Sequence, residues 1–385
     1  MIVRFLFLAI FLIFSKATFA SDKEIQFPKP TGSFSVGYKV VEFTEGSRLD
    51  PYHTEDLRRL KVTIYYPSND EKTKEPYGHE EVVFWKRELI EPLQSEDINS
   101  EEFNSVVNQV TNLKVFKSKN ALPETGPFPV ILFEHGFGVT AGSYQGMILD
   151  LVSHGYIVLA PSHPYIADTV TFEDGKETFL KSERDALMFE TAFLDTQFIL
   201  EKMDEIASTV PSMDLTKIGM IGHSLGGATT IRTTRINSRV KAGIGLDAPV
   251  HHNTYDYDGD ERNSSTLDSD ITLDYGSDFA KPFLHIFAEK PMCDLSTVHL
   301  ATNNFKAIVK GTEHNSFADH GLLKDNITLF KSKGWHLGAG NANTLSYYPE
   351  LNSLIRAFFD KFLKAKQVDL INLSSDVITI ETTKD

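Results

Sequence analysis

The five residues Gly222-His223-Ser224-Leu225-Gly226 carry the strongest chemical signal in this sequence. They follow a short apolar stretch, KIGMI, and precede a helical pattern that starts at Leu225. A serine between two glycines at a turn from strand to helix is typical of a nucleophile elbow, in which the hydroxyl projects at the end of the strand. The two glycines let the strand and the helix approach closely. We therefore predict that Ser224 is a nucleophile; the alternative is a purely structural turn.

A serine hydroxyl is a weak nucleophile until a base removes its proton. His314 fits this role, because it lies in the loop GTEHN after the apolar stretch FKAIV and comes later in the chain than the serine. His251 and His252 follow the end of another predicted strand and are the main rivals. His135 and His163 lie near strand ends, where they could line the pocket.

An acidic residue must orient the imidazole and stabilise its positive charge. Asp247 ends the apolar stretch GIGLD, and Asp294 follows the next predicted strand, FLHIFA, with Glu289 as a weaker option. Spacing alone barely separates the two aspartates, so both remain candidates from the residues themselves.

A tetrahedral intermediate also needs hydrogen-bond donors for its oxyanion. The stretch His135-Gly136-Phe137-Gly138 comes directly after the strand-like PVILF, where enzymes with such an elbow supply one backbone N–H. The residue after the nucleophile supplies the other. The predicted donors are therefore the amides of Phe137 and Leu225, and a plain glycine turn is the alternative.

Alternating strands and helices are predicted to position these residues. The strand-like stretches are 38–43, 60–66, 129–133, 156–160, 217–221, 240–246, 283–288 and 305–309, and the helical patterns are 143–153, 182–207, 225–234 and 349–363. Strands separated by helices indicate crossover connections and a mostly parallel sheet with helices on both faces. We predict an α/β fold of this kind.

One hydrolase domain over residues 21–366 is expected, with insertions at about 70–127 and 250–281 and a loosely attached tail at 367–385. The first insertion has an apolar piece at Phe84, Trp85, Leu89 and Ile90. Such a patch could contact a lipid surface, or it could belong to a helix packed on the sheet.

Five stretches together resemble the plasma-type platelet-activating factor acetylhydrolases and their bacterial relatives: EHGFG, SYQGMILDLVSHGYIVLAPSHPY, KIGMIGHSLGGATTIRT, GIGLDAPV and GTEHNSFADH. The resemblance runs from about Pro129 to His320. It implies the α/β-hydrolase fold, calcium-independent removal of short or oxidised acyl chains from phospholipids, Asp247 as the acid in place of Asp294, and His314 as the base. It also places the oxyanion donors at Phe137 and at the residue after the nucleophile.

Two features depart from that family. Leu225 stands where the plasma enzymes have an aromatic residue, and a long polar segment at 251–280 borders the predicted acid. Within this segment, Asp256, Asp258, Asp260 and Glu261 form only a fragment of a calcium loop, which lacks its closing glutamate. We expect a solvated acidic loop, no metal and no cofactor.

Composition limits the other function classes. The 385 residues include 38 Lys+Arg and 53 Asp+Glu, for a formal net charge of −15, which argues against a general nucleic-acid binder. Cys293 is the single cysteine, so the chain forms no internal disulfide. Residues 1–20 combine Arg4, the apolar run FLFLAIFLIF and small residues up to Ala20, which is typical of a secretory signal. An exported protein, periplasmic or secreted, is expected.

These observations predict an exported serine ester hydrolase that acts through an acyl-enzyme on an ester or phospholipid substrate, with possible contact to a lipid surface. The alternatives are a general carboxylesterase, lipase or polyester hydrolase and, more remotely, a non-catalytic binding protein on the same fold. An intact Ser, His and acid set favours the enzyme.

Overall fold

A computed structural model describes residue 25 and residues 27–71, 73–96, 98–181, 186–248, 280–292 and 304–382. The expected signal segment at 1–20, most of the expected insertion at 250–281 and the predicted helix start at Ser182 lie outside these residues. Within the described part, no helix has the length and apolar character needed to cross a membrane.

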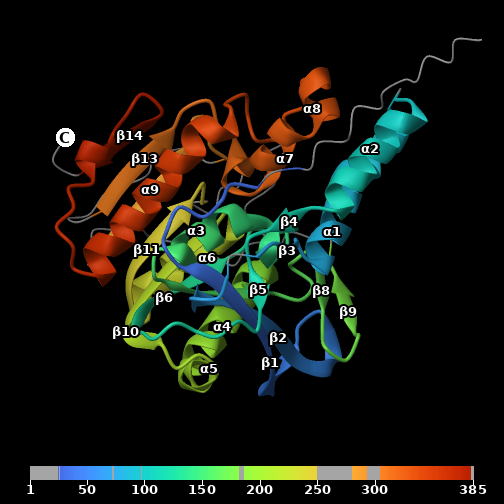
Figure 1. Ribbon diagram of the computed structural model, residues 1–385. Coiled ribbons are helices and arrows are strands. Elements are labelled where there is room, and N and C mark those ends of the chain that lie inside the picture. Colours follow the sequence, from blue (N-terminus) through green and yellow to red (C-terminus); the bar gives the residue numbers. More distant parts are fainter. Residues whose placement is uncertain are drawn as a thin grey trace, which may run out of the picture.

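A single ten-stranded sheet forms the centre of the fold (Figure 1). β6, β7, β10, β11, β12 and β13 run parallel, whereas β2 pairs antiparallel with β7 and with β1, and β14 pairs antiparallel with β13. The order across the sheet is β14 (Ile378–Thr382), β13 (Asn304–Val309), β12 (Phe283–Ala288), β11 (Val240–Leu246), β10 (Met213–His223), β6 (Phe128–Glu134), β7 (Ile157–Ser162), β2 (His53–Ser68), β1 (Ser35–Asp50) and β5 (Ser118–Lys119). This is the mostly parallel sheet of the α/β-hydrolase fold.

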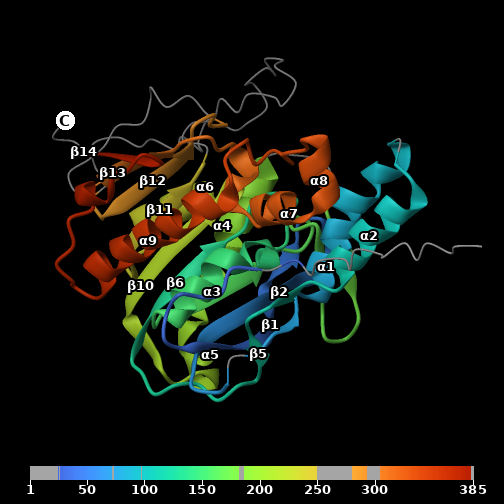
Figure 2. The same cartoon turned by 45° about the horizontal axis from the view of Figure 1, so that its top comes forward.

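Helices cover both faces of the sheet. Successive side chains of a strand point to opposite faces, so each strand packs against both layers of helices. On β6, Ile131 and Phe133 pack in the cluster that contains α3 (Gln145–Ser153) and α9 (Thr344–Leu363). Val130 and Leu132 pack in the cluster that contains α4 (Ala186–Glu201) and α5 (Met203–Thr209). α6 (Leu225–Ile236) lies on the α4 side, where Thr234 contacts Gly243 of β11. Figure 2 shows α3 and α9 together over one face.

The insertion before β6 is helical, as predicted, and packs against the main core. It contains α1 (His79–Trp85), which continues as a π-helical turn over Lys86–Ile90, and α2 (Ser100–Thr111), with a small β3–β4 pair (Glu75–Pro76 and Lys114–Val115). Asn99 caps α2 in a capping box with Glu102. Figures 1 and 2 show α1 and α2 at one end of the sheet, beside α7 (His320–Asn326) and α8 (Thr328–Lys333).

The apolar piece of this insertion is buried rather than exposed. Phe84, Trp85, Leu89 and Ile90 are between 0% and 6% exposed and belong to the main core. The interpretation as a lipid-contacting patch is therefore wrong for these side chains. The other interpretation, a helix packed on the domain, is correct, because apolar side chains of this size gain more from burial than from a solvent-facing position.

The chain after Lys366 also differs from the expected loose tail. It ends in β14, which extends the sheet by pairing Ile378 and Ile380 with Val309 and Ala307 of β13. Both isoleucines are buried. A five-residue strand with alternating apolar residues carries no helical pattern, and this short period-two signal is why the sequence analysis left it unassigned. A further short hairpin, β8 (Thr169–Thr171) and β9 (Glu177–Phe179), follows β7.

Candidate active site

Ser224 stands at the turn between β10 and α6 with the strained backbone that a nucleophile elbow requires. Its φ is 55° and its ψ is −120°, a conformation that non-glycine residues rarely adopt. A Cβ on Gly222 would lie 2.2 Å from the carbonyl oxygen of Gly226, and a Cβ on Gly226 would lie 2.2 Å from that of Glu134. Both positions need glycine because the strand and the helix approach so closely, as the sequence predicted.

Asp247 and His314 are joined by a hydrogen bond of 2.6 Å between Oδ2 and Nδ1. Asp247 follows β11 directly and is fully buried, and its carboxylate also accepts the backbone N–H groups of Ala288 (3.1 Å) and Met292 (3.3 Å). Because a carboxylate accepts hydrogen bonds, the Nδ1 of His314 carries the hydrogen. Nε2 is then the ring nitrogen that can receive a proton.

The competing candidates are placed differently. Asp294, the alternative acid, and the rival bases His251 and His252 lie outside the described residues, as does Cys293. The carboxylate of Glu289 accepts the backbone N–H of Gly311 at 3.0 Å, which makes it a support for the turn before His314.

A directed chain of hydrogen bonds links the base loop to the elbow. The Nε2–H of His223 donates to the carbonyl oxygen of His314 at 3.0 Å, and the centroids of the two imidazole rings lie 4.5 Å apart. Burial lowers the pKa of His223 well below its ordinary value, so this imidazole is neutral and its Nδ1 accepts. The hydroxyl of Tyr144 donates to that Nδ1 at 2.9 Å and accepts the backbone N–H of Gly136 at 3.0 Å. Base loop, elbow and predicted oxyanion loop are therefore connected.

The predicted oxyanion loop borders Ser224. A Cβ on Gly136 would lie 3.4 Å from the Cβ of Ser224. Phe137 and Leu225, whose amides are the predicted donors, pack in the same apolar cluster, together with Ile166, Met188 and Ala192. This arrangement places both residues beside the serine; their role as donors stays a prediction.

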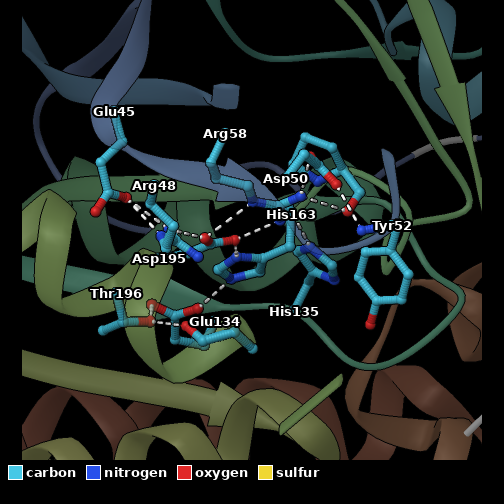
Figure 3. A network of polar contacts seen from close by, with 12 residues as sticks. Glu45, Arg48, Asp50, Tyr52, Arg58, Glu134, His135, His163, Asp195 and Thr196 are labelled. Carbon is cyan, nitrogen blue, oxygen red and sulfur yellow. Dashed lines mark hydrogen bonds and ion pairs between the residues drawn. The ribbon is translucent and has the colours of Figure 1, made fainter. Parts of the chain in front are cut away.

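His135 and His163 are each 1% exposed, so they do not line an open pocket, the role that their strand-end positions would have allowed. They lie instead in a buried network of charged side chains (Figure 3). Glu134 and Asp195, which are also fully buried, each form a hydrogen bond with one of the two ring nitrogens of His163.

Sequence reasoning missed Tyr144 and the linking role of His223. The histidine was visible inside the elbow motif, but its two hydrogen-bond partners come from distant loops and leave no local pattern. Tyr144 lies in the stretch SYQG, eight residues after Gly136, where a single tyrosine carries no periodic signal.

Metal binding has no support in the described part of the chain, where no group of three or more His, Cys, Asp or Glu side chains could hold an ion. The acidic residues at 256–261 lie outside the described residues.

Comparisons with known proteins match this chain mainly to one family of esterases. A family model described as "Platelet-activating factor acetylhydrolase, isoform II" matches residues 19–203 and 191–336. The chain is 31% identical over 180 residues to a platelet-activating factor acetylhydrolase of Bos taurus, covering 35% of this chain and 39% of that protein. It is 25% identical over 231 residues to a probable 1-alkyl-2-acetylglycerophosphocholine esterase of Arthroderma benhamiae, covering 57% and 58%.

The aligned part of the chain spans about half the length of the curated relatives it matches. Among solved structures, a ferulic acid esterase from Streptomyces cinnamoneus matches with a TM-score of 0.68 and 22% identity, over 92% of this chain and 98% of that one. At this identity the match shows a shared fold.

Proposed function

Because this chain belongs to the platelet-activating factor acetylhydrolase isoform II family, we propose that it is a serine ester hydrolase that acts through an acyl-enzyme. The observation that carries the proposal is the 2.6 Å hydrogen bond between His314 Nδ1 and Asp247 Oδ2. His314 also lies against His223, the residue that precedes Ser224 in the strained elbow. A base oriented by a buried acid next to such a serine is the arrangement that ester hydrolysis needs.

Acylation begins when the Oγ of Ser224 attacks the ester carbonyl carbon and its proton passes to Nε2 of His314. The carbonyl oxygen becomes an oxyanion, which the amides of Phe137 and Leu225 stabilise. As the tetrahedral intermediate collapses, the bond to the leaving oxygen breaks and His314 returns the proton to that oxygen. The alcohol departs and the acyl group stays on the serine.

Deacylation repeats these steps with water. His314 removes a proton from a water molecule, whose oxygen attacks the acyl carbonyl, and the same amides stabilise the second oxyanion. The bond to Oγ then breaks, His314 reprotonates Ser224, and the carboxylic acid leaves. The carboxylate of Asp247 stabilises the imidazolium in both halves of the reaction.

For the substrate, we propose short or oxidised acyl groups on phospholipids, on the strength of the family and of the esterase named among the relatives. The second candidate is a general carboxylesterase, lipase or polyester hydrolase. It is considered because this chain shares its fold with a ferulic acid esterase. An acyl-length series separates them: acetyl against palmitoyl at the second position of a phosphatidylcholine, with p-nitrophenyl acetate to palmitate beside it. Preference for the acetyl phospholipid supports the first.

The catalytic assignment is tested with Ser224→Ala, measured by hydrolysis of p-nitrophenyl acetate. Loss of the nucleophile should lower kcat by at least about 10³-fold. Ser238→Ala is the matched control, since Ser238 is an exposed serine after α6 whose change should leave turnover unaltered. Wild type without turnover, or a Ser224→Ala variant with full turnover, would refute the proposal.

The same assay decides the acid. Asp247→Asn should lower kcat by at least about 10³-fold, because the imidazole loses both its orientation and the charge that stabilises it. Asp294→Asn should cost much less, and a larger loss in that variant would reject Asp247.

A further inference from the structure

A buried network of charges adjoins the oxyanion loop (Figure 3). It gathers residues from four elements and one connecting segment: Asp50 and Arg48 from β1, Arg58 from β2, Glu134 from the end of β6, Asp195 from α4, and His163 from the segment after β7. Arg58, Glu134, His163 and Asp195 are each at most 1% exposed. Burying so many charges is costly unless each is paired, so the pairing is informative.

Asp195 is the centre of this network. Arg58 donates to both of its carboxylate oxygens, from Nε at 3.0 Å and from a terminal nitrogen at 2.6 Å, and Arg48 adds a contact of 2.5 Å. The other terminal nitrogen of Arg58 donates to Asp50 at 2.8 Å. Burial alone would raise the pKa of Asp195, but Arg58 and His163 hold it well below its usual range. Asp195 is therefore ionised.

His163 lies between two carboxylates. Its Nδ1 is 3.0 Å from Asp195 and its Nε2 is 2.7 Å from Glu134. Since both partners are acceptors, both ring nitrogens carry hydrogen, and the side chain is an imidazolium cation. Burial by itself would lower the pKa of His163, but the two carboxylates outweigh it and raise the pKa to about 9.

The His163 segment holds the oxyanion loop at both ends. At the start of the loop, the backbone N–H of His163 donates to Nε2 of His135 at 3.2 Å, and Nδ1–H of His135 donates to the carbonyl of Gly136 at 2.7 Å. At the end of the loop, the N–H of Gly138 donates to the carbonyl of Ile166, whose own N–H donates to the carbonyl of His163. Phe137 lies between these two anchored ends.

The nucleophile elbow packs against the backbone at the start of the oxyanion loop. A Cβ on Gly226 would lie 2.2 Å from the carbonyl oxygen of Glu134 and 2.6 Å from that of His135. With so little space, a shift of Glu134 would move the elbow and the oxyanion loop relative to each other. The charge pair between Glu134 and His163 opposes that shift.

We propose that His163 is a positioning residue: as a buried cation clamped between Glu134 and Asp195, it fixes the amide of Phe137 in the oxyanion position. This inference rests on the proposed function, because it assigns the role of a residue that supports the same reaction.

His163→Gln tests the proposal directly, with p-nitrophenyl acetate as the substrate. An amide in place of the cation should let the loop relax, so that kcat falls by about 10- to 100-fold while KM changes by less than about 3-fold, the pattern of lost transition-state stabilisation. The melting transition of the variant shows whether it is folded. A folded His163→Gln variant with kcat within twofold of wild type would overturn the proposal.

The pH profile separates positioning by a cation from simple structural support. In wild type, kcat should fall as pH rises through about 9, where His163 loses its proton. Glu134→Gln keeps contacts to His163 and Thr196 but removes one negative charge, so the alkaline limb should move down by at least about one pH unit. Arg48→Gln removes a positive charge from the same network and should move the limb upward.

The groups that face His163 are Glu134, Asp195 and the ring of His135, whose centroid is 5.0 Å from that of the His163 ring, and Arg58 binds the same Asp195 carboxylate. If the limb stays in place in Glu134→Gln, or moves down equally in Arg48→Gln, His163 does not act as a positioning cation. Because Glu134→Gln preserves the hydrogen bonds, this test remains available if His163→Gln fails to fold.

Parallel measurements distinguish this inference from the proposed function. If wild type hydrolyses esters, Ser224→Ala does not, and the His163 and Glu134 variants behave as wild type, only the positioning role fails. The ring ¹⁵N shifts of His163 give a readout that needs no turnover. Two protonated ring nitrogens at pH 7.5 support the cation, and a neutral ring at that pH overturns it.

Discussion

At the residue scale, two histidines next to Ser224 and the predicted oxyanion loop have opposite charge states for physical reasons. His163 is flanked by carboxylates and is a cation, whereas His223 has a hydroxyl and a carbonyl as its partners and is neutral. A histidine's charge follows from what faces its two nitrogens. The neutral ring of His223 accepts one hydrogen bond and donates another, whereas the charged ring of His163 holds a backbone segment in place.

Tyr144 is the residue that completes the neutral chain. Tyr144→Phe leaves the N–H of Gly136 and Nδ1 of His223 without their partner inside the protein. Leaving buried polar groups unsatisfied costs about 1–3 kcal/mol, so the free energy of unfolding should fall by that amount, and kcat should fall with it because three loops lose their link. Urea denaturation measures the first effect and ester hydrolysis the second.

Tyr66→Phe is the matched control. The hydroxyl of this buried tyrosine donates to a single carbonyl, that of Ala121, in a part of the sheet away from Ser224. Its loss leaves that one carbonyl unsatisfied, so it should also cost about 1–3 kcal/mol, but it should leave kcat unchanged. Equal kcat for the two variants would argue against a special role for Tyr144.

At the element scale, the apolar periodicity of the sequence was enough to place most strands and helices. β11 and β12 begin and end where the sequence predicted, because each is a short, mostly apolar run that is buried inside the sheet except at Lys241. β1 and β2 extend beyond their apolar parts, since backbone pairing continues into a polar two-stranded ribbon. α9 starts at Thr344 instead of Pro349, with Asn343 as its cap.

Contacts between distant elements explain why part of the site escaped prediction. Ser224, Phe137 and Leu225 belong to motifs with local spacing, so the sequence identified them as candidates. Asp195 lies within a helix and Arg58 within a strand, and neither position differs locally from an ordinary surface charge. Their burial depends on β2, β7 and α4 meeting at one place, which is a property of the fold.

β14 gives a test at this scale. Ile380 is 5% exposed and faces the core, whereas its neighbour Thr379 points to solvent. Ile380→Ala should lower the free energy of unfolding by about 2–5 kcal/mol through lost burial and a cavity, while Thr379→Ala should change it by no more than about 0.5 kcal/mol. Thermal or urea unfolding measures both. Equal effects would mean that residues after Lys366 do not stabilise the sheet.

At the scale of the whole molecule, buried histidines should make stability depend on pH. Burial lowers the pKa of His135, His285 and His320 to about 3, and that of His223 well below its ordinary value. Each is neutral when folded but gains a proton near pH 6.5 when unfolded. Their contribution is therefore present above pH 6.5 and is lost as the pH falls.

Buried carboxyl groups act in the opposite direction. Burial raises the pKa of Asp319 to about 7 and also raises those of Glu81 and Asp168, so these groups release their protons at a higher pH in the folded state than in the unfolded chain. Near pH 5 the histidines dominate, so the unfolded state binds more protons than the folded state. The free energy of unfolding should therefore fall as the pH is lowered below 6.5.

The prediction is a melting temperature that is highest near pH 6.5 and falls steeply toward pH 4.5. On the alkaline side His163 should contribute a decline between pH 6.5 and about 9, because in that range it keeps its proton in the folded state only. His285→Gln removes one of the four neutral histidines, and should reduce the acid slope by about 1.4 kcal/mol per pH unit. A melting temperature that stays constant from pH 4.5 to 6.5 would contradict the assignment of these four histidines as neutral in the folded state.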